Sequence, residues 1–282
     1  MVLVAAGQIT STSSLVENGQ TVVKLISKAV ELGVKILFLP EASDYIAKDA
    51  DHSKSIAVSV EKSPFILAIQ SKLKELHSIG KLIEINVGIH EPSLNSDRVR
   101  NTSIWLNSKG EITQRYQKIH LFDVNISGKV TVTKESDSVE PGDNILEPFD
   151  TIAAMRLRSL GADILTYPSA FTMRTGPAHW HLLGRARAID SQSYVILPAQ
   201  SGQHTHEVEN EDGSTTRVPT RITYGHSLIV DPWGTVVSEV SDVEVGKSAL
   251  AIADIDLELV EKVRRDMPLW QQRRPDVFGY EV

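Results

Sequence analysis

The sequence predicts an α/β protein in which helices cover a mixed β-sheet. Three observations carry this prediction: short apolar runs alternate with longer segments of helical periodicity, two turn sequences sit between pairs of short strands, and the composition is that of a globular chain. Of the 282 residues, 41% are hydrophobic and 23% are charged. Because α/β folds reach this length as one unit, we expect a single domain over residues 1–282.

The first forty residues follow the order strand, helix, strand. Residues 2–8 form a short apolar run suited to a buried strand, and Thr12 or Ser13 can cap the helix that follows. Gly33 ends this helix, whose apolar positions fall on one face. Residues 35–39 are again apolar and predict a second buried strand.

Further elements repeat this alternation. The expected ones are a helix at 64–77, a strand at 85–89, a hairpin of strands at 102–106 and 112–117, a helix at 179–188, a strand at 194–198, and a second hairpin that turns at residues 231–234. The order of elements predicts a layered α/β architecture with a mixed sheet.

An internal similarity links the two halves of the chain. Residues 33–42 and 161–170 share Gly, Ile, Leu, Pro and Ala at equivalent places, as the halves of a pseudo-symmetric sandwich would. A strand and a helix precede Gly33, whereas only residues 152–160 precede Gly161 after a polar segment. We therefore expect one sheet strand, and part of a helix, to be missing near residue 152.

Charge and composition restrict the partners. The net charge is -7 and Lys and Arg are not concentrated in one stretch, which argues against nucleic-acid binding. Apolar runs stay well short of the ~18 residues of a membrane span, and the first residues lack a basic leader. We expect no membrane or nucleic-acid partner and a cytoplasmic location, with the mitochondrion as an alternative. The chain has no cysteine, so it lacks the commonest strong nucleophile at neutral pH.

Three charged residues are candidates for chemistry. Glu41 follows a strand at its carboxyl end, where α/β sheets place their sites, and a half-buried carboxylate there should have a raised pKa suited to proton transfer. Lys118 also ends a strand and would stabilise an oxyanion. Glu135 lies in a polar loop. From position alone the commoner alternatives are a helix N-terminal acid or a surface charge for Glu41, and a solvent-exposed charge for Lys118 and Glu135.

The nine histidines form no recognisable metal-ligand pattern. His179 and His181 are two apart on a predicted helix and face different directions, while His204 and His206 lie in what we predict to be a polar loop. We therefore expect neither a metal nor a cofactor.

Nine ordered blocks of residues resemble the nitrilase superfamily of carbon-nitrogen hydrolases. They are residues 38–42 (FLPEA), 98–101 (RVRN), 116–123 (YQKIHLFD), Glu135 with 141–142 (PG), 168–172 (PSAFT), Thr175-Gly176 with His179-Trp180, 183–188 (LGRARA), 224–227 (YGHS) and 231–234 (DPWG). The similarity runs from Ala5 to about Arg274. Residues 121–124 and 267–274 most resemble the fungal deaminated glutathione amidase branch.

The resemblance implies a four-layer α-β-β-α sandwich and a Glu-Lys-Cys site. In such a site Glu41 is the general base, Lys118 holds the tetrahedral oxyanion, and Glu135 positions the lysine and the substrate. The implied reaction is hydrolysis of the side-chain amide of a 2-oxo acid, with deaminated glutathione yielding 2-oxoglutarate and Cys-Gly. The related ω-amidase reaction differs only in its leaving group. A homodimer is implied as well.

The family pattern is interrupted where the nucleophile belongs. Between residues 141–142 and 156–161, relatives carry a strand and the catalytic cysteine, but this chain has only residues 151–155. The resemblance implies that roughly sixteen to twenty residues are absent here, in agreement with the short second half found from the internal similarity. Three explanations of this gap stay open. The printed sequence skips a segment that the protein has, the sequence comes from an altered gene, or the fold compensates for a real deletion by different packing. Ala153 or Ala154 could stand where the nucleophile was.

Two function classes therefore remain open. In the first, a form of the protein that contains the cysteine segment is an amidase, and the chain without cysteine is inactive. In the second, the chain is a catalytically dead relative that binds 2-oxo acids or protein partners.

Substrate binding is predicted for Phe171, Thr172 and Arg174, which follow the second-half strand as Glu41 follows the first. A 2-oxo acid brings a carboxylate next to two acids, so it needs a compensating cation, and Arg174 is the nearest candidate. A surface arginine on a loop is the alternative.

A dimer interface is predicted from the helix that carries His179, Trp180, Leu182 and Leu183, together with residues 267–280. Both segments place large apolar or aromatic groups beside arginines, which is the composition of interface cores.

Overall fold

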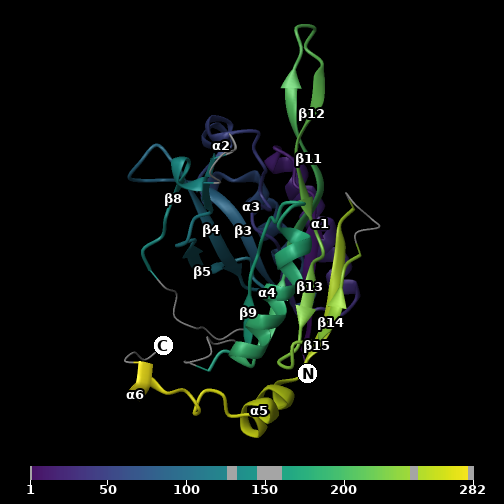
Figure 1. Ribbon diagram of the computed structural model, residues 1–282. Helices are drawn as coiled ribbons and strands as arrows, with labels where there is room; N and C mark the ends of the chain where they lie inside the picture. The colour runs from purple at the N-terminus through teal and green to yellow at the C-terminus, as the bar shows by residue number, and fades with distance from the viewer. Residues whose placement is uncertain (1, 126–131, 145–160, 242–246, 279–282) are drawn as a thin grey trace.

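Two β-sheets lie between layers of helices in the computed structural model, which describes residues 2–125, 132–144, 161–241 and 247–278 (Figure 1). In chain order the elements are β1 (Val2–Ile9), α1 (Leu15–Glu31), β2 (Ile36–Phe38), α2 (Ala50–Ile56), α3 (Pro64–Ser78), β3 (Glu84–Pro92), β4 (Val99–Leu106), β5 (Ile112–Gln117), β6 (Asp123–Asn125), β7 (Val132–Lys134), β8 (Val139–Glu140), β9 (Ile164–Thr166), α4 (Gly176–Ser191), β10 (Tyr194–Leu197), β11 (Ala199–Glu209), β12 (Thr215–Tyr224), β13 (Leu228–Val230), β14 (Val236–Glu239), β15 (Ala249–Ile255), α5 (Leu257–Asp266) and α6 (Pro275–Phe278). Short 3-10 helices lie at Val60–Lys62 and Glu135–Asp137.

Both sheets are mixed, as predicted. Within the described residues the larger one follows the order β12-β11-β1-β2-β3-β4-β5, with β15 beside β1 and β8 beside β4. Its strands β1, β2 and β3 are parallel, and β3, β4 and β5 are antiparallel. The smaller sheet follows the order β14-β13-β10-β9, in which β9 and β10 are parallel.

Three apolar clusters hold the layers together. One joins α1 and α3 to the outer face of the larger sheet, and a second fills the space between the two sheets. The third packs α4 on the outer face of the smaller sheet, through residues such as Trp180 and Leu197. The predicted α-β-β-α sandwich is therefore confirmed. The strand expected to be missing near residue 152 falls in 145–160, outside the described residues.

The ends of α1 show how local sequence sets an element. Ser14, one residue beyond the expected caps, accepts a hydrogen bond from the backbone N–H of Glu17. Gly33 follows the last turn with a φ of 82°. This left-handed conformation is unfavourable for residues other than glycine. The predicted hairpins are also present, as β4–β5 and β13–β14.

The expected polar loop around His204 and His206 is wrong. Both residues lie on β11, which pairs with β12 in a hairpin that projects from the body of the protein (Figure 1). His204 is fully buried, and its ring nitrogens contact the Ser11 carbonyl and the Thr223 hydroxyl. The prediction failed because polar residues fill this hairpin, and backbone pairing rather than apolar periodicity forms it.

The expectation for Trp180 as an interface residue is also wrong. Its side chain is only 2% exposed, packs against Phe171, and donates a hydrogen bond to the His226 carbonyl. Leu182 and Leu183 on the same helix are 68% and 42% exposed. In the described part of the chain, no helix combines the length and the hydrophobicity that crossing a membrane would require.

Candidate active site

Four polar side chains meet at one end of the larger sheet. Lys118 Nζ lies 3.0 Å from Glu41 Oε1 and 2.9 Å from Glu135 Oε2. Asn101 Nδ2 donates to Glu41 Oε1 at 2.6 Å and also lies 3.4 Å from Glu135 Oε1. The fold therefore brings together the three predicted residues and adds an amide to them.

Glu41 is held by its backbone as well as its side chain. It follows β2, and Gln200 Nε2 donates to the carbonyl oxygens of Glu41 and Ala42 at 3.0 and 2.9 Å. Gly88 passes so close that a Cβ there would lie 2.7 Å from Glu41 Cα, so only glycine fits. This packing fixes the position of the carboxylate at the carboxyl end of β2, as predicted from the sequence.

The electrostatics of Glu41 correct one expectation. Burial is the largest single influence and raises the pKa of the carboxyl, but the Lys118 charge, with hydrogen bonds from Lys118 and Asn101, outweighs it. The pKa of Glu41 is therefore lowered rather than raised. The sequence could not show this because the opposing cation comes from a distant strand. At neutral pH Glu41 is an ionised carboxylate, able to accept a proton.

Lys118 lies between two carboxylates. Burial opposes its charge, yet the negative charges of Glu41 and Glu135 raise its pKa, so the ammonium stays protonated. Glu135 is oriented by the backbone N–H of Phe122, which donates to its Oε2 at 2.7 Å. The side chains of Lys118 and Glu135 are 30% and 17% exposed, so both are shielded from water but remain accessible. Neither side chain is therefore a freely solvated surface charge, while their catalytic roles stay predictions.

The three predicted substrate-binding residues lie beyond the end of β9. The Phe171 ring packs against Trp180 with centroids 4.8 Å apart, so it contributes to the core beneath α4. Thr172 is exposed and its hydroxyl contacts that of Thr175. Arg174 is exposed and makes no ion pair with another described residue. Their contact with a substrate stays a prediction.

Gln200 connects the two halves of the chain at this site. Its backbone N–H donates to the Ser169 carbonyl at 3.0 Å, while its side chain holds the Glu41 carbonyl. The segments that follow β2 and β9 therefore approach the same place, as the internal similarity suggested. Ala153, the suggested stand-in for the nucleophile, lies outside the described residues.

Sequence reasoning missed three residues near Glu41. Asn101 belonged to a recognised block, but its role as a donor to both carboxylates became visible only in the fold. Gln200 lies beyond a strand that was predicted without a function. Arg221 on β12 is the third: burial of its guanidinium lowers its pKa, and the charge of Glu41 acts in the opposite direction. The block at residues 98–101 marks Asn101, whereas no local sequence signal marks Gln200 or Arg221.

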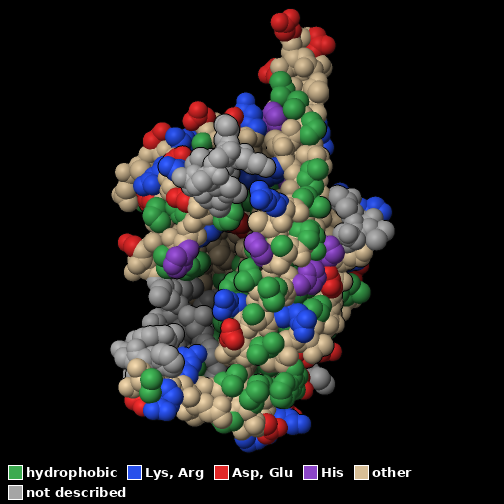
Figure 2. All heavy atoms as spheres, viewed as in Figure 1, with side chains coloured by type: hydrophobic (Ala, Val, Ile, Leu, Met, Phe, Trp, Pro, Cys, Tyr) green, Lys and Arg blue, Asp and Glu red, His purple; other side chains and the backbone are tan. Residues whose placement is uncertain are grey.

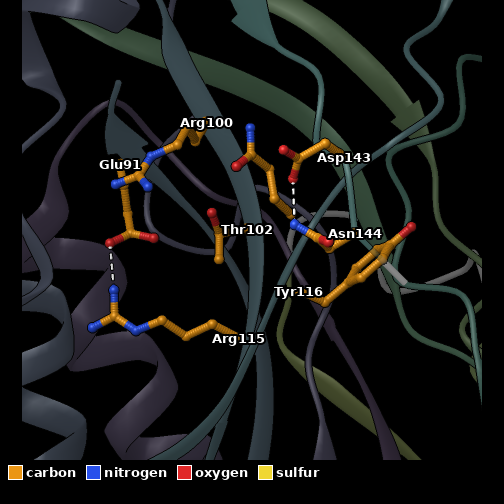
Figure 3. Close-up of a pocket in the computed structure, with 8 residues that line it drawn as sticks. Glu91, Arg100, Thr102, Arg115, Tyr116, Asp143 and Asn144 are labelled. Carbon is orange, nitrogen blue, oxygen red and sulfur yellow. Dashed lines mark hydrogen bonds and ion pairs between the residues drawn. The ribbon is translucent and has the colours of Figure 1, made fainter. Parts of the chain in front are cut away.

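A separate charged hollow of about 230 Å³ lies over β4 and β5 (Figure 3). Arg115 points at the buried Glu91, with Nη1 2.9 Å from Oε1. Arg100 and Thr102 line this hollow, while Asn101 between them reaches Glu41. Side chains alternate along a strand, so this hollow and the acid–lysine site, formed by Glu41, Lys118, Glu135 and Asn101, lie on opposite faces of β4.

The sequence of the chain matches the carbon-nitrogen hydrolase family over residues 3–265. The chain belongs to the carbon-nitrogen hydrolase family. The resemblance inferred from the ordered blocks is thus confirmed.

Curated relatives in this family are similar over nearly the whole chain. The probable hydrolase nit2 of Schizosaccharomyces pombe is 40% identical over 295 residues, which cover 99% of each chain. The deaminated glutathione amidase of Mus musculus is 38% identical and covers 98% of this chain and 84% of that protein.

Solved structures of family members have the same fold. The NitFhit protein of Caenorhabditis elegans gives a TM-score of 0.84 at 31% identity, with 99% of this chain and 66% of that chain covered. Nit3 of Saccharomyces cerevisiae, a member of branch 10 of the nitrilase superfamily, gives 0.74 at 28% identity, with 97% and 96% covered.

Proposed function

We propose that this carbon-nitrogen hydrolase has the site of an amidase for 2-oxo acid amides, with deaminated glutathione as its substrate. The observation that carries the proposal is the contact of Lys118 with both Glu41 and Glu135. Relatives named deaminated glutathione amidase, at 36–38% identity in four mammals, support the choice of substrate.

The chemistry of the site follows from its charges. With a thiol as nucleophile, the ionised Glu41 takes the thiol proton, and the thiolate attacks the amide carbon. Lys118, held protonated by its two carboxylates, donates to the oxyanion that forms. Glu41 then returns the proton to the leaving amine, and a water molecule that Glu41 activates releases 2-oxoglutarate from the thioester. Glu135 and Asn101 position Lys118 and Glu41 during these steps.

The chain as printed has no thiol to perform this attack. We propose that the nucleophile segment belongs between residues 142 and 161. The alignment with the Schizosaccharomyces pombe relative supports the absence of such a segment, because it spans 295 positions whereas the chain has 282 residues, so at least 13 positions lack a residue from this chain. The location rests on the family-like blocks on either side, at residues 141–142 and 168–172. The alternative function, favoured by the absence of cysteine, is that of a catalytically dead relative that binds 2-oxo acids or protein partners.

A cation for the substrate carboxylate is part of the proposal. Arg174 is the first candidate, because it is exposed after the second-half strand and no described carboxylate neutralises it. Arg221 is a second candidate, since its charge acts on Glu41. Its Nη2 donates to the Ala47 carbonyl at 3.1 Å, which holds the guanidinium in place.

We further propose that residues 1–282 form one domain. The pairing of β15 with β1, from Val2 opposite Ile255 to Gln8 opposite Ala249, supports this because it joins the two ends of the fold within one sheet.

Grafting the corresponding segment of the Schizosaccharomyces pombe relative between residues 142 and 161 tests the proposed function. We expect the graft to release Cys-Gly from deaminated glutathione, and Glu41→Gln in the graft to abolish release. A graft whose nucleophilic cysteine is replaced by alanine is the matched control and should be inactive. A folded graft that binds but does not hydrolyse the substrate would contradict the proposal.

The intact mass of the native protein tests whether the segment is naturally absent. A mass equal to the 31.1 kDa of the printed chain would mean that it is absent, and a larger mass would mean that it is present.

A further inference from the structure

A cluster of two histidines and a glutamate lies apart from the acid–lysine site. His181 comes from α4, His226 precedes β13, and Glu239 ends β14. Glu239 Oε1 lies 2.8 Å from His181 Nε2 and 2.6 Å from His226 Nδ1, and the potential ligand atoms all lie within 4.8 Å of one another. Figure 2 shows histidine side chains beside acidic ones on the molecular face that carries α4.

The position of His226 is built into the fold. Its φ of 59° lies in the left-handed region, which a residue other than glycine adopts at a cost of about 1 kcal/mol. The buried Trp180 holds its carbonyl through a 2.7 Å hydrogen bond, and the Tyr224 ring stacks on the imidazole at 4.4 Å. The hydrogen bond to its carbonyl and the stacking on its ring hold His226 in place, with Nδ1 2.6 Å from Glu239 Oε1.

The donor set has a chemical preference. Two imidazole nitrogens and one carboxylate oxygen are ligands that suit Zn²⁺ and related transition metals, whereas Mg²⁺ and Ca²⁺ prefer oxygen alone. Bonds of about 2.0 to 2.1 Å in a tetrahedral site separate ligand atoms by roughly 3.3 Å. The atoms are now 2.6 and 2.8 Å apart where they share protons, so small side-chain rotations would admit the ion. The side chains of His181 and Glu239 are 33% and 32% exposed, which leaves a path for the ion and for a water molecule as fourth ligand.

We propose that His181, His226 and Glu239 bind a divalent transition-metal ion of the zinc type, which clamps α4 to the β13–β14 hairpin. The ion replaces the two protons that the imidazoles share with Glu239, and each neutral ring then carries its proton on the other nitrogen. This site contains none of the residues placed in amide hydrolysis, so the proposal does not depend on the proposed function.

The first test measures Zn²⁺ binding to chelator-treated protein at pH 7.5 by isothermal titration calorimetry. We expect one saturable site per chain with a dissociation constant in the micromolar range or below, and a Tm that rises with added Zn²⁺. Binding should weaken at pH 5.5 because protons compete for the imidazoles. A protein without saturable binding at pH 7.5 would overturn the proposal.

Variants locate the ion. Glu239→Gln keeps a hydrogen-bond acceptor but removes the charge, and His181→Ala removes one ligand, so each should weaken binding at least tenfold. His179→Ala is the matched control, since it removes an exposed histidine two residues from His181 on the same helix, and it should bind as the native protein does. Unchanged circular dichroism without zinc shows that the variants fold.

A rival histidine pair provides the decisive comparison. The rings of His52 and His206 lie 5.9 Å apart, and His206→Asn should leave the affinity for Zn²⁺ unchanged. Loss of binding in His206→Asn together with retained binding in Glu239→Gln would overturn the proposal. None of these measurements uses an amide substrate, so their failure is distinct from failure of the proposed function.

Discussion

Lys118 Nζ lies 3.0 Å from Glu41 Oε1 although 77 residues separate them in the chain. Glu41 lies just beyond the end of β2, and Lys118 lies just beyond the end of β5. The contact between them therefore depends on the order of strands in the larger sheet. The contact keeps the carboxylate ionised despite its burial, and the proposed base therefore depends on the proposed oxyanion donor.

Removal of the Lys118 charge should raise the pKa of Glu41. In Lys118→Met the burial that raises this pKa remains, while the opposing charge and hydrogen bond disappear. We also expect a loss of about 1 to 3 kcal/mol in the free energy of unfolding at pH 7, because two partly buried carboxylates remain without their cation. Carbon-13 NMR titration of the glutamate carboxyls measures the shift. The exposed Lys109→Met is the control, and an equal Glu41 pKa in both variants would contradict this account.

Stability should fall in mild acid because of His204. Burial lowers the pKa of this histidine to about 4, below its ordinary value of 6.5, so the unfolded chain takes up the proton first. The neutral, buried imidazole therefore leaves the fold at full stability above pH 6.5. As the pH falls toward 4, the free energy of unfolding decreases by roughly 3 kcal/mol. Urea unfolding at several pH values should therefore show a weaker pH dependence in His204→Gln than in the native protein.

An exposed histidine controls for the His204 effect. His179→Gln should retain the pH dependence of the native protein, because it replaces an exposed side chain and leaves the buried His204 in place. Identical pH profiles for His204→Gln and the native protein would mean that His204 is not buried as the structure has it.

Arg174 should matter only for charged substrates. In the grafted protein, Arg174→Ala should lower kcat/KM for 2-oxo acid amides by roughly 10- to 100-fold, which corresponds to the ~1.4 to 3 kcal/mol of a charged hydrogen bond. An uncharged amide should lose little. Equal losses for both amides would assign Arg174 to loop structure, and the same comparison with Arg221→Gln would show whether that residue holds the carboxylate.

We predict that two copies of the chain associate through the exposed leucines of α4. Of the apolar and aromatic residues of α4 that were predicted to form the interface, Leu182 and Leu183 are exposed and Trp180 is not, so the two leucines are the ones available to a second copy. We expect a dimeric mass by light scattering at micromolar concentration, and a monomeric mass for Leu182→Glu. Native protein that is already monomeric would rule out this interface.

Glu41 and Lys118 could be predicted from the sequence because each follows an apolar or alternating strand, and strand ends are places where sites form. Their roles depended on the resemblance to the nitrilase superfamily, since a lone acid or lysine is more often a solvated charge. The lowered pKa of Glu41 was beyond sequence reasoning, as it is a balance between burial and a charge brought in by folding.

The β11–β12 hairpin and the His181 cluster show where sequence patterns failed. Polar side chains on β11 conceal a strand whose first half is buried, so apolar periodicity gives no signal there. His181 was compared with its neighbour His179, whereas its partner Glu239 lies 58 residues away on β14. Contacts of this kind arise from sheet order and from the docking of α4, which no local pattern encodes.

Glu41, Lys118 and Glu135 meet in one place, but the chain has no cysteine to act as the nucleophile. The proposed role of this site is tested by incubating the purified 282-residue protein with deaminated glutathione and measuring released Cys-Gly against a buffer control. We expect no release above the control, because Glu41 and Lys118 can supply a base and an oxyanion donor but no acyl acceptor equal to a thiolate. Release that exceeds the control and disappears in Glu41→Gln would contradict it, and would point to direct attack by water activated at Glu41.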